Sequence, residues 1–157
     1  MPTSVLFVCL GNICRSPLAE GVFRHLVKEQ YPGSEYIVDS AGTGGWHAGS
    51  APHEGSIEIA DKHGVDITHQ QSRQVLASEL SQWDWIIAMD GANRSNLLRI
   101  GADPGKTKLL LSFIPPGYNR DVPDPYYDGG FDRVYDLVEQ GCSFLLDFLE
   151  SEKGALT

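Results

Sequence analysis

The residues best suited to chemistry stand near the N-terminus, in the segment Cys9-Leu10-Gly11-Asn12-Ile13-Cys14-Arg15-Ser16. A cysteine thiolate is a strong nucleophile that needs no metal. The planar guanidinium of Arg15 can hold two oxygens of a phosphoryl group at once, which a lysine cannot do. The Ser16 hydroxyl can donate a hydrogen bond to the Cys9 sulfur. Together these residues predict covalent chemistry on an anion such as a phosphoryl group.

The same segment lies between a predicted strand and a predicted helix. Val5-Leu6-Phe7-Val8 is apolar throughout, as strands of parallel sheets are. Ser16-Pro17 predicts a helix start, with the serine as the cap and the proline at the first helical position. In such a loop the N–H groups converge where the helix dipole adds positive potential. Gly11 and Asn12 tolerate the positive φ that this requires, so we expect an anion cradle that favours the Cys9 thiolate.

The simpler interpretation of Cys9 is a free cysteine at the end of a buried strand. The arginine that follows it, the Gly-Asn loop and the Ser-Pro helix start together favour the nucleophile instead. The net charge of −9 means that positive potential for an anion must be concentrated locally. It also argues against the broad basic surface that nucleic-acid binding needs.

Cleaving a phosphate ester also requires a proton for the leaving oxygen. Asp121, Asp124 and Asp128 lie in a Pro- and Tyr-rich loop ahead of the last predicted helix. Asp124 stands between two prolines that restrict its backbone, whereas Asp128 is typical of a helix start and Asp121 of a solvated side chain. Chemistry alone favours Asp124 only modestly. Tyr126 and Tyr127 are either packing residues or the walls of a slot for a phenyl ring.

The elements that must position these residues alternate along the chain. The patterns predict strands at 5–8, 36–38, 85–89 and 108–111, and helices at 16–30, 52–63, 91–100 and 131–148. Alternating strands and helices predict an α/β fold with a parallel sheet and right-handed crossovers. Ligands bind at the carboxyl ends of such strands, which is where the loop after Val8 lies.

Length and composition predict one domain over residues 1–157, large enough to form a core without disulfides. The apolar run Val5 to Leu10 is too short for a signal peptide or a membrane span. Three cysteines are sparse and odd in number, unlike a secreted disulfide framework. We therefore expect a cytoplasmic protein.

The sequence resembles the low molecular weight protein tyrosine phosphatase family. Four motifs carry the resemblance in order along nearly the whole chain, and their combination is highly specific: VCLGNICRSP at 8–17, DSAGT at 39–43, AMD at 88–90 and DPYY at 124–127. The resemblance implies a three-layer α/β domain in which helices flank both faces of a four-stranded parallel sheet.

The resemblance also implies a two-step mechanism that uses no metal or cofactor. Cys9 would attack phosphorus in line, Arg15 would bind the phosphoryl group, and Asp124 would protonate the leaving phenol. Asp124 would then activate water to hydrolyse the cysteinyl-phosphate. The implied partners are tyrosine-phosphorylated proteins and a cognate tyrosine kinase. We expect a monomer without nucleic-acid or membrane partners, although an exposed aromatic rim would be compatible with weak self-association.

Supporting roles carry over in the same way. A strained Asn12 would be fixed by Ser40 and His69, which without the resemblance are a strand-end hydroxyl and a surface or capping residue. Cys14 either packs or traps an oxidised Cys9 as a disulfide. The implied loop-shaping residues are Leu10, Gly11, Asn12, Ile13, Cys14, Ser40 and His69. The implied cleft residues are Leu10, Ile13, Trp46, Asp90, Asn93, Tyr126 and Tyr127.

Three alternative functions would use a related anion-binding loop. A protein arginine phosphatase shares the scaffold, but that branch has threonine at the position of Ile13 and lacks the paired tyrosines. A thioredoxin-coupled arsenate reductase uses a nearby downstream cysteine pair, whereas no cysteine lies between Cys14 and Cys142. A silent phosphate-binding module would lack the nucleophile, the arginine or the acid. Cys9 and Cys14 also have no companion ligands at metal-site spacing.

Overall fold

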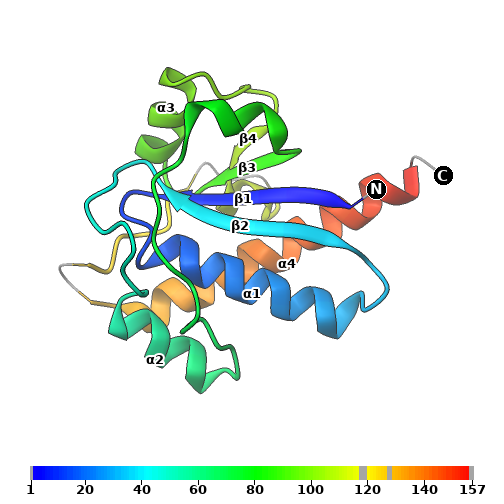
Figure 1. Ribbon diagram of the computed structural model, residues 1–157. Coiled ribbons are helices and arrows are strands. Elements are labelled where there is room, and N and C mark those ends of the chain that lie inside the picture. The colour runs from blue at the N-terminus through cyan, green and yellow to red at the C-terminus, as the bar shows by residue number, and fades with distance from the viewer. Residues whose placement is uncertain (1, 117–119, 127–128, 156–157) are drawn as a thin grey trace.

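In the part of the chain that the structure describes, four parallel strands form one sheet in the order β2-β1-β3-β4 (Figure 1). The computed structural model describes residues 2–116, 120–126 and 129–155. The parallel sheet confirms the predicted fold class. The strands are β1 (Thr3–Cys9), β2 (Tyr36–Gly42), β3 (Trp85–Ala88) and β4 (Thr107–Leu109).

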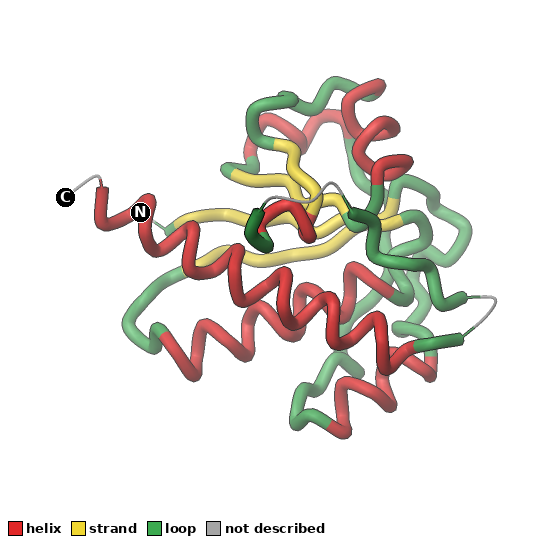
Figure 2. The backbone as a smooth tube through the Cα atoms, turned by 180° about the vertical axis from the view of Figure 1, so that it is seen from behind, coloured by secondary structure: helices red, strands yellow, loops and turns green. Residues whose placement is uncertain are grey.

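Helices cover both faces of this sheet and complete the three layers. α1 and α4 pack side by side below one face, with α2 beside them, while α3 lies over the other (Figures 1 and 2). The α-helices are α1 (Arg15–Gln30), α2 (Glu54–Lys62), α3 (Gly91–Arg99) and α4 (Phe131–Ala155). Among the described residues, two short 3-10 helices, η1 (Ala77–Gln82) and η2 (Leu110–Phe113), lie directly before β3 and directly after β4.

The apolar run of β1 is buried on both sides, as its composition predicts. Val5, Phe7 and Cys9 face the core shared with α1 and α4, and Leu6 and Val8 face the smaller core on the other side. Because side chains alternate along a strand, this register turns Cys9 toward the layer that contains α1.

The loop after β1 occupies the switch point of the sheet. The chain runs from β1 to β2 on one side and then crosses to β3 on the other, so the connections leave β1 in opposite directions. At such a point the loops separate and leave a crevice at the carboxyl ends of the strands. The site predicted after Val8 lies at this crevice.

Several predicted boundaries differ from the structure: β2 extends to Gly42 and α4 to Ala155, and two other differences have a clear physical reason. α1 begins at Arg15 with Cys14 as the N-cap residue and no side-chain cap, so Ser16 is not the cap. The last strand ends at Leu109 because Leu110 and Leu111 turn into η2. Both leucines are fully buried, and an apolar run of this length fits a strand or a tight helical turn equally well.

Among the described residues, no helix has the length and apolar character needed to span a membrane.

Candidate active site

The loop between β1 and α1 turns its carbonyl groups outward. Each of five carbonyl oxygens accepts a hydrogen bond from a segment outside the loop, at 2.7 to 3.1 Å. Among the described residues, the N–H groups of Gly11, Ile13 and Cys14 meet no protein acceptor. These N–H groups and the amino end of α1 therefore form an anion cradle. The accepting oxygens belong to Cys9, Leu10, Gly11, Ile13 and Cys14, and the donors are Thr43 N, Gly44 N, Ser72 Oγ, His53 N and Ser56 Oγ.

The Cys9 sulfur lies at the mouth of this cradle. Ser16 Oγ is 3.0 Å from Cys9 Sγ, and the Asn12 N–H donates to the same sulfur at 3.3 Å. Both contacts stabilise negative charge on sulfur. The thiol is free and only 2% exposed, so access is confined to the cavity above it.

The strained residue of the loop is Asn12, with a φ of 55°. Its amide nitrogen donates to Ser16 Oγ at 2.8 Å and Ser40 Oγ at 3.0 Å, while its oxygen accepts from the Arg73 N–H at 3.0 Å. The side chain is 2% exposed, so these three bonds satisfy a buried amide that holds the loop in a left-handed turn.

The Nη1 atom of Arg15 is anchored, whereas Nη2 and Nε remain available to an anion in the cradle. Its Nη1 donates to Asp90 Oδ2 at 2.6 Å and to the Val122 carbonyl at 2.9 Å. The buried Nε has no partner within the described residues, and Nη2 has only a long contact to Asp124 Oδ2 at 3.5 Å. Burial would lower the pKa of Arg15, but the charges of Cys9, Asp90 and Asp124 outweigh it and raise the pKa. A fixed cation thus presents two donors to an incoming oxyanion.

Asp124 reaches the site on a loop attached to the end of β3. The Val122 N–H donates to the Met89 carbonyl at 2.8 Å, and Val122 is fully buried. Beyond this anchor, Asp124 Oδ1 accepts from the Tyr126 N–H at 3.0 Å. The Asp124 side chain is 38% exposed and faces the cavity that contains Cys9. An acid–base residue therefore stands across from the nucleophile.

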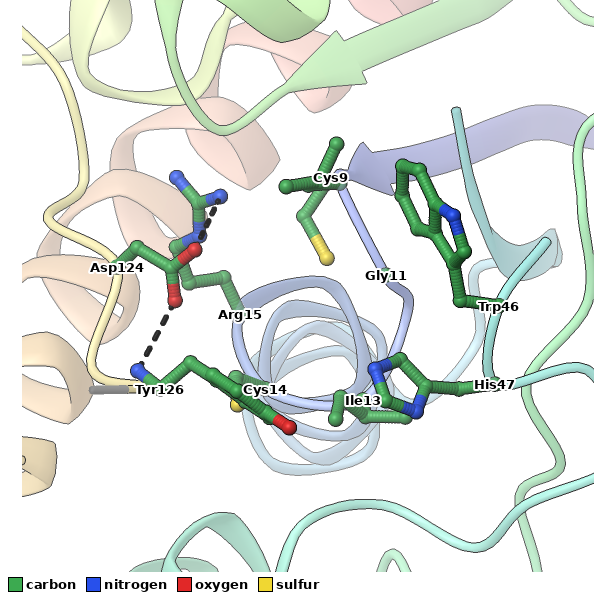
Figure 3. A pocket seen from close by; sticks show the side chains of 10 residues that line it. Cys9, Gly11, Ile13, Cys14, Arg15, Trp46, His47, Asp124 and Tyr126 are labelled. Carbon is green, nitrogen blue, oxygen red and sulfur yellow. Dashed lines mark hydrogen bonds and ion pairs between the residues drawn. The ribbon is translucent and has the colours of Figure 1, made fainter. Parts of the chain in front are cut away.

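A cavity of about 370 Å³ opens above the Cys9 sulfur. Figure 3 shows the sulfur between Arg15 with Asp124 on one side and Trp46 with His47 on the other. Trp46 is 73% exposed and Tyr126 is 42% exposed, so both walls present aromatic rings to solvent. The lining residues are Cys9, Leu10, Gly11, Ile13, Cys14, Arg15, Trp46, His47, Asp124 and Tyr126.

The assignment of His69 to the loop is wrong. His69 is exposed and lines a different hollow, beside Arg24 and Lys28. The Asn12 oxygen that it would have held instead accepts from the Arg73 backbone. Because a backbone N–H belongs to every residue except proline, no residue type in the sequence marks this contact.

Asp90 and Asn93 were expected to line the cavity, but neither residue does. Asp90 lies behind Arg15, and its second oxygen caps α3 by accepting from the Asn93 N–H at 2.7 Å. Asn93 is 2% exposed in the first turn of α3. The sequence correctly predicts Asp90 as a helix cap, but the pairing with Arg15 depends on how β1 and β3 align.

Cys14 is a buried free thiol, and burial together with the Cys9 and Asp124 charges raises its pKa to about 12. Its disulfide with Cys9 stays a prediction. Tyr127 and Asp128 lie outside the described residues.

Sequence reasoning missed several residues that shape the site. His47 lines the cavity, and its ring centroid is 5.9 Å from that of Tyr126. Ser72 holds the Gly11 carbonyl, and Glu20 accepts from Ser40 at 2.8 Å. The sequence signal for His47 is its position directly after Trp46, which the resemblance places in the cleft. Glu20 stands in a predicted helix where an acidic residue normally faces solvent.

Comparison with known proteins gives consistent matches. A family model described as low molecular weight phosphotyrosine protein phosphatase matches residues 4–155. A curated relative, the low molecular weight protein-tyrosine-phosphatase YfkJ of Bacillus subtilis, is 44% identical over 152 residues, covering 96% of this chain and 97% of its own.

Solved structures agree with this match. The crystal structure of Bacillus subtilis YfkJ has a TM-score of 0.92 at 43% identity and covers 98% of both chains. The crystal structure of a Drosophila arginine phosphatase has a TM-score of 0.84 at 33% identity, covering 92% of this chain and 96% of its own. This protein thus belongs to the low molecular weight phosphotyrosine protein phosphatase family.

Proposed function

We propose that this protein hydrolyses phosphotyrosine in proteins, and aryl phosphates generally, through a cysteinyl-phosphate on Cys9. One observation carries the proposal: Cys9, the free donors of Arg15 and the Asp124 carboxyl all face one cavity. A nucleophile, an oxyanion clamp and an acid–base group in one cavity are what phosphoryl transfer requires.

In the first step, the Cys9 sulfur forms a bond to phosphorus as the bond from phosphorus to the phenolic oxygen breaks. Arg15 and the loop N–H groups hold the equatorial oxygens, where charge spreads in the transition state. The protonated Asp124 gives its proton to the phenolic oxygen, so the product leaves as a neutral phenol.

In the second step, Asp124 takes a proton from water while the water oxygen bonds to phosphorus. The sulfur–phosphorus bond breaks, inorganic phosphate forms and the Cys9 thiolate is regenerated. The Ser16 hydroxyl, 3.0 Å from Cys9 Sγ, stabilises the sulfur as it leaves. The Asp124 proton is thereby restored for the next turnover.

The cavity walls support an aryl substrate. Leu10, Ile13, Trp46 and Tyr126 present apolar or aromatic surface around the anion cradle. Such walls suit a phenyl ring, since aromatic rings prefer offset or edge contacts with one another. A guanidinium phosphate is the second candidate, favoured by the similarity to the Drosophila arginine phosphatase. Ile13 argues against it, because an aliphatic side chain offers no hydrogen-bond acceptor to the guanidinium N–H groups.

Phosphate release from matched phosphotyrosine and phosphoarginine peptides tests this choice. We expect release from phosphotyrosine, and its complete loss in Cys9→Ser. Preference for phosphoarginine would keep the Cys9 chemistry but overturn the assigned substrate. Turnover that survives Cys9→Ser would overturn the mechanism itself.

The role of Asp124 has its own test with a series of aryl phosphates. Asp124→Asn removes the transferable proton, so the rate should fall most for phenols of high pKa, which leave poorly without protonation. An equal loss for every leaving group would contradict the acid role.

We place the protein in the cytoplasm, with phosphorylated proteins and a cognate tyrosine kinase as its partners. The proposed catalytic unit is a monomer, formed by a single domain over residues 1–157. The sparse and odd set of three cysteines supports a reducing compartment. Retention of activity at the elution volume of a monomer in gel filtration would support the monomeric state.

A further inference from the structure

The buried network around Asn12 has a defined hydrogen-bond direction. A backbone N–H can only donate, so the Asn12 atom that faces Arg73 N at 3.0 Å must be the amide oxygen. The amide nitrogen therefore faces Ser16 and Ser40, at 2.8 and 3.0 Å. Because this nitrogen cannot accept, both hydroxyls must accept from it and send their own protons elsewhere.

Among the described residues, each hydroxyl has one acceptor for its proton. The Ser16 proton points to Cys9 Sγ at 3.0 Å, and the Ser40 proton points to Glu20 Oε1 at 2.8 Å. A continuous chain of directed hydrogen bonds thus joins Glu20 to the Cys9 sulfur through Ser40, Asn12 and Ser16. Hydrogen bonds in such chains polarise and orient one another.

The carboxylate that ends the chain is buried. Glu20 is 5% exposed on α1, and its other oxygen, Oε2, accepts from Arg24 Nε at 3.2 Å. Burial raises the pKa of Glu20, and the bonds from Ser40 and Arg24 oppose the rise. Burying a carboxylate is costly, and an apolar residue would pack against the sheet without that cost.

We propose that Glu20 is a positioning residue for the Cys9 chemistry, acting through Ser40 and Asn12 to keep the Ser16 hydroxyl proton on the sulfur. The inference rests on the proposed function, in which Cys9 is first the nucleophile and then the leaving group. The effect is largest in the second step. There the sulfur–phosphorus bond breaks, the thiolate takes the electron pair and the Ser16 proton stabilises the charge that develops on sulfur.

Glu20→Gln tests this with almost unchanged shape. Glutamine has one oxygen for two donors, and the charged Arg24 attracts it more strongly, which turns the amide nitrogen toward Ser40. Ser40 then has no acceptor for its proton, and its hold on Asn12 weakens. We expect hydrolysis of the cysteinyl-phosphate to slow about tenfold, the loss of roughly one hydrogen bond to a charged group.

Rapid kinetics with p-nitrophenyl phosphate separates the steps. In Glu20→Gln we expect a full burst of nitrophenol followed by the slower steady rate, with unchanged inhibition by inorganic phosphate. A loop that is merely distorted would instead lose burst amplitude and phosphate affinity, which would overturn the proposal. Wild-type steady turnover in Glu20→Gln would also overturn it.

Two further variants keep the test specific. Glu29→Gln makes the same change on α1 at a carboxylate that is 59% exposed and, within the described residues, pairs with His25. An equal slowing there would assign the effect to general charge and refute the proposal. Ser40→Ala should slow hydrolysis similarly, and adding Glu20→Gln to it should cost nothing more. Additive losses would show that Glu20 does not act through Ser40.

Ser40→Ala also serves if Glu20→Gln does not fold, because wild-type hydrolysis in Ser40→Ala would contradict the chain. Cys9→Ser is measured alongside these variants. If Cys9→Ser still turns over, the proposed function fails. If it is inactive while Glu20→Gln behaves as wild type, only the role of Glu20 fails.

Discussion

Asp90 combines two roles, and Asp90→Asn separates them. Its Oδ2 holds Arg15 Nη1 at 2.6 Å, and its Oδ1 caps α3 through the Asn93 N–H at 2.7 Å. Asparagine caps helices as well as aspartate, so its oxygen can keep the second bond. Its amide nitrogen would then face a guanidinium N–H, donor against donor. The anchor of Arg15 is lost while α3 keeps its cap.

The expected loss follows from that anchor. A hydrogen bond to a charged group contributes about 1.5–3 kcal/mol, so kcat/KM should fall about ten- to a hundredfold if the bond holds Arg15 in its transition-state geometry. The Val122 carbonyl still holds Nη1 at 2.9 Å, which limits the loss. Removing a negative charge near the cradle also favours anions, so inhibition by inorganic phosphate should change less than kcat.

Steady-state kinetics and thermal unfolding of Asp90→Asn and Asp90→Ala check this reasoning. Both variants should lose activity equally, while Asp90→Ala should lose about 1 kcal/mol more stability because its cap is gone. Wild-type kcat/KM in Asp90→Asn would refute the anchoring role. A loss seen only in Asp90→Ala would assign it to α3 instead.

Three other perturbations have defined outcomes. The hydrogen bonds from Arg73 lower the pKa of Glu79 from 4.5 to about 2, so the stability that this group contributes is present above pH 4.5 and lost toward pH 2. Unfolding of wild type and Glu79→Gln should therefore converge as pH falls through that window. Gly42→Ala should impair turnover, because its Cβ would lie 2.8 Å from the Leu10 carbonyl oxygen. At pH 8, iodoacetamide should leave Cys14 unmodified, as burial raises its pKa to about 12.

The reacting groups were predictable because residue type and spacing specify them. Cys9 and Arg15 lie at the two ends of one loop, and the strand and helix that flank it follow from apolar patterning. Asp124 was harder to select, since three aspartates share its loop. Its selection follows from the attachment of Val122 to β3, which brings Asp124 to the cavity.

The supporting contacts were less predictable because they join segments far apart in the chain. Asn12 is held by Ser40 from β2 and by the Arg73 backbone, which has no side-chain signature. The start of α1 shows the same limit. Ser16 has the residue type of a cap, but its hydroxyl is engaged by Asn12 and lies beside the Cys9 sulfur. The amino end of α1 is thus left to the anion.

The most direct test of the central claim is to trap the phosphorylated enzyme. Wild-type protein is mixed with p-nitrophenyl phosphate, quenched in acid within the first turnover, digested and mapped by mass spectrometry. The mechanism predicts a phosphoryl group on the peptide that contains Cys9, with the sulfur as its site and none in Cys9→Ser. Release of phosphate with no phosphorylated peptide at any quench time, or a phosphoryl group on another residue, would contradict it.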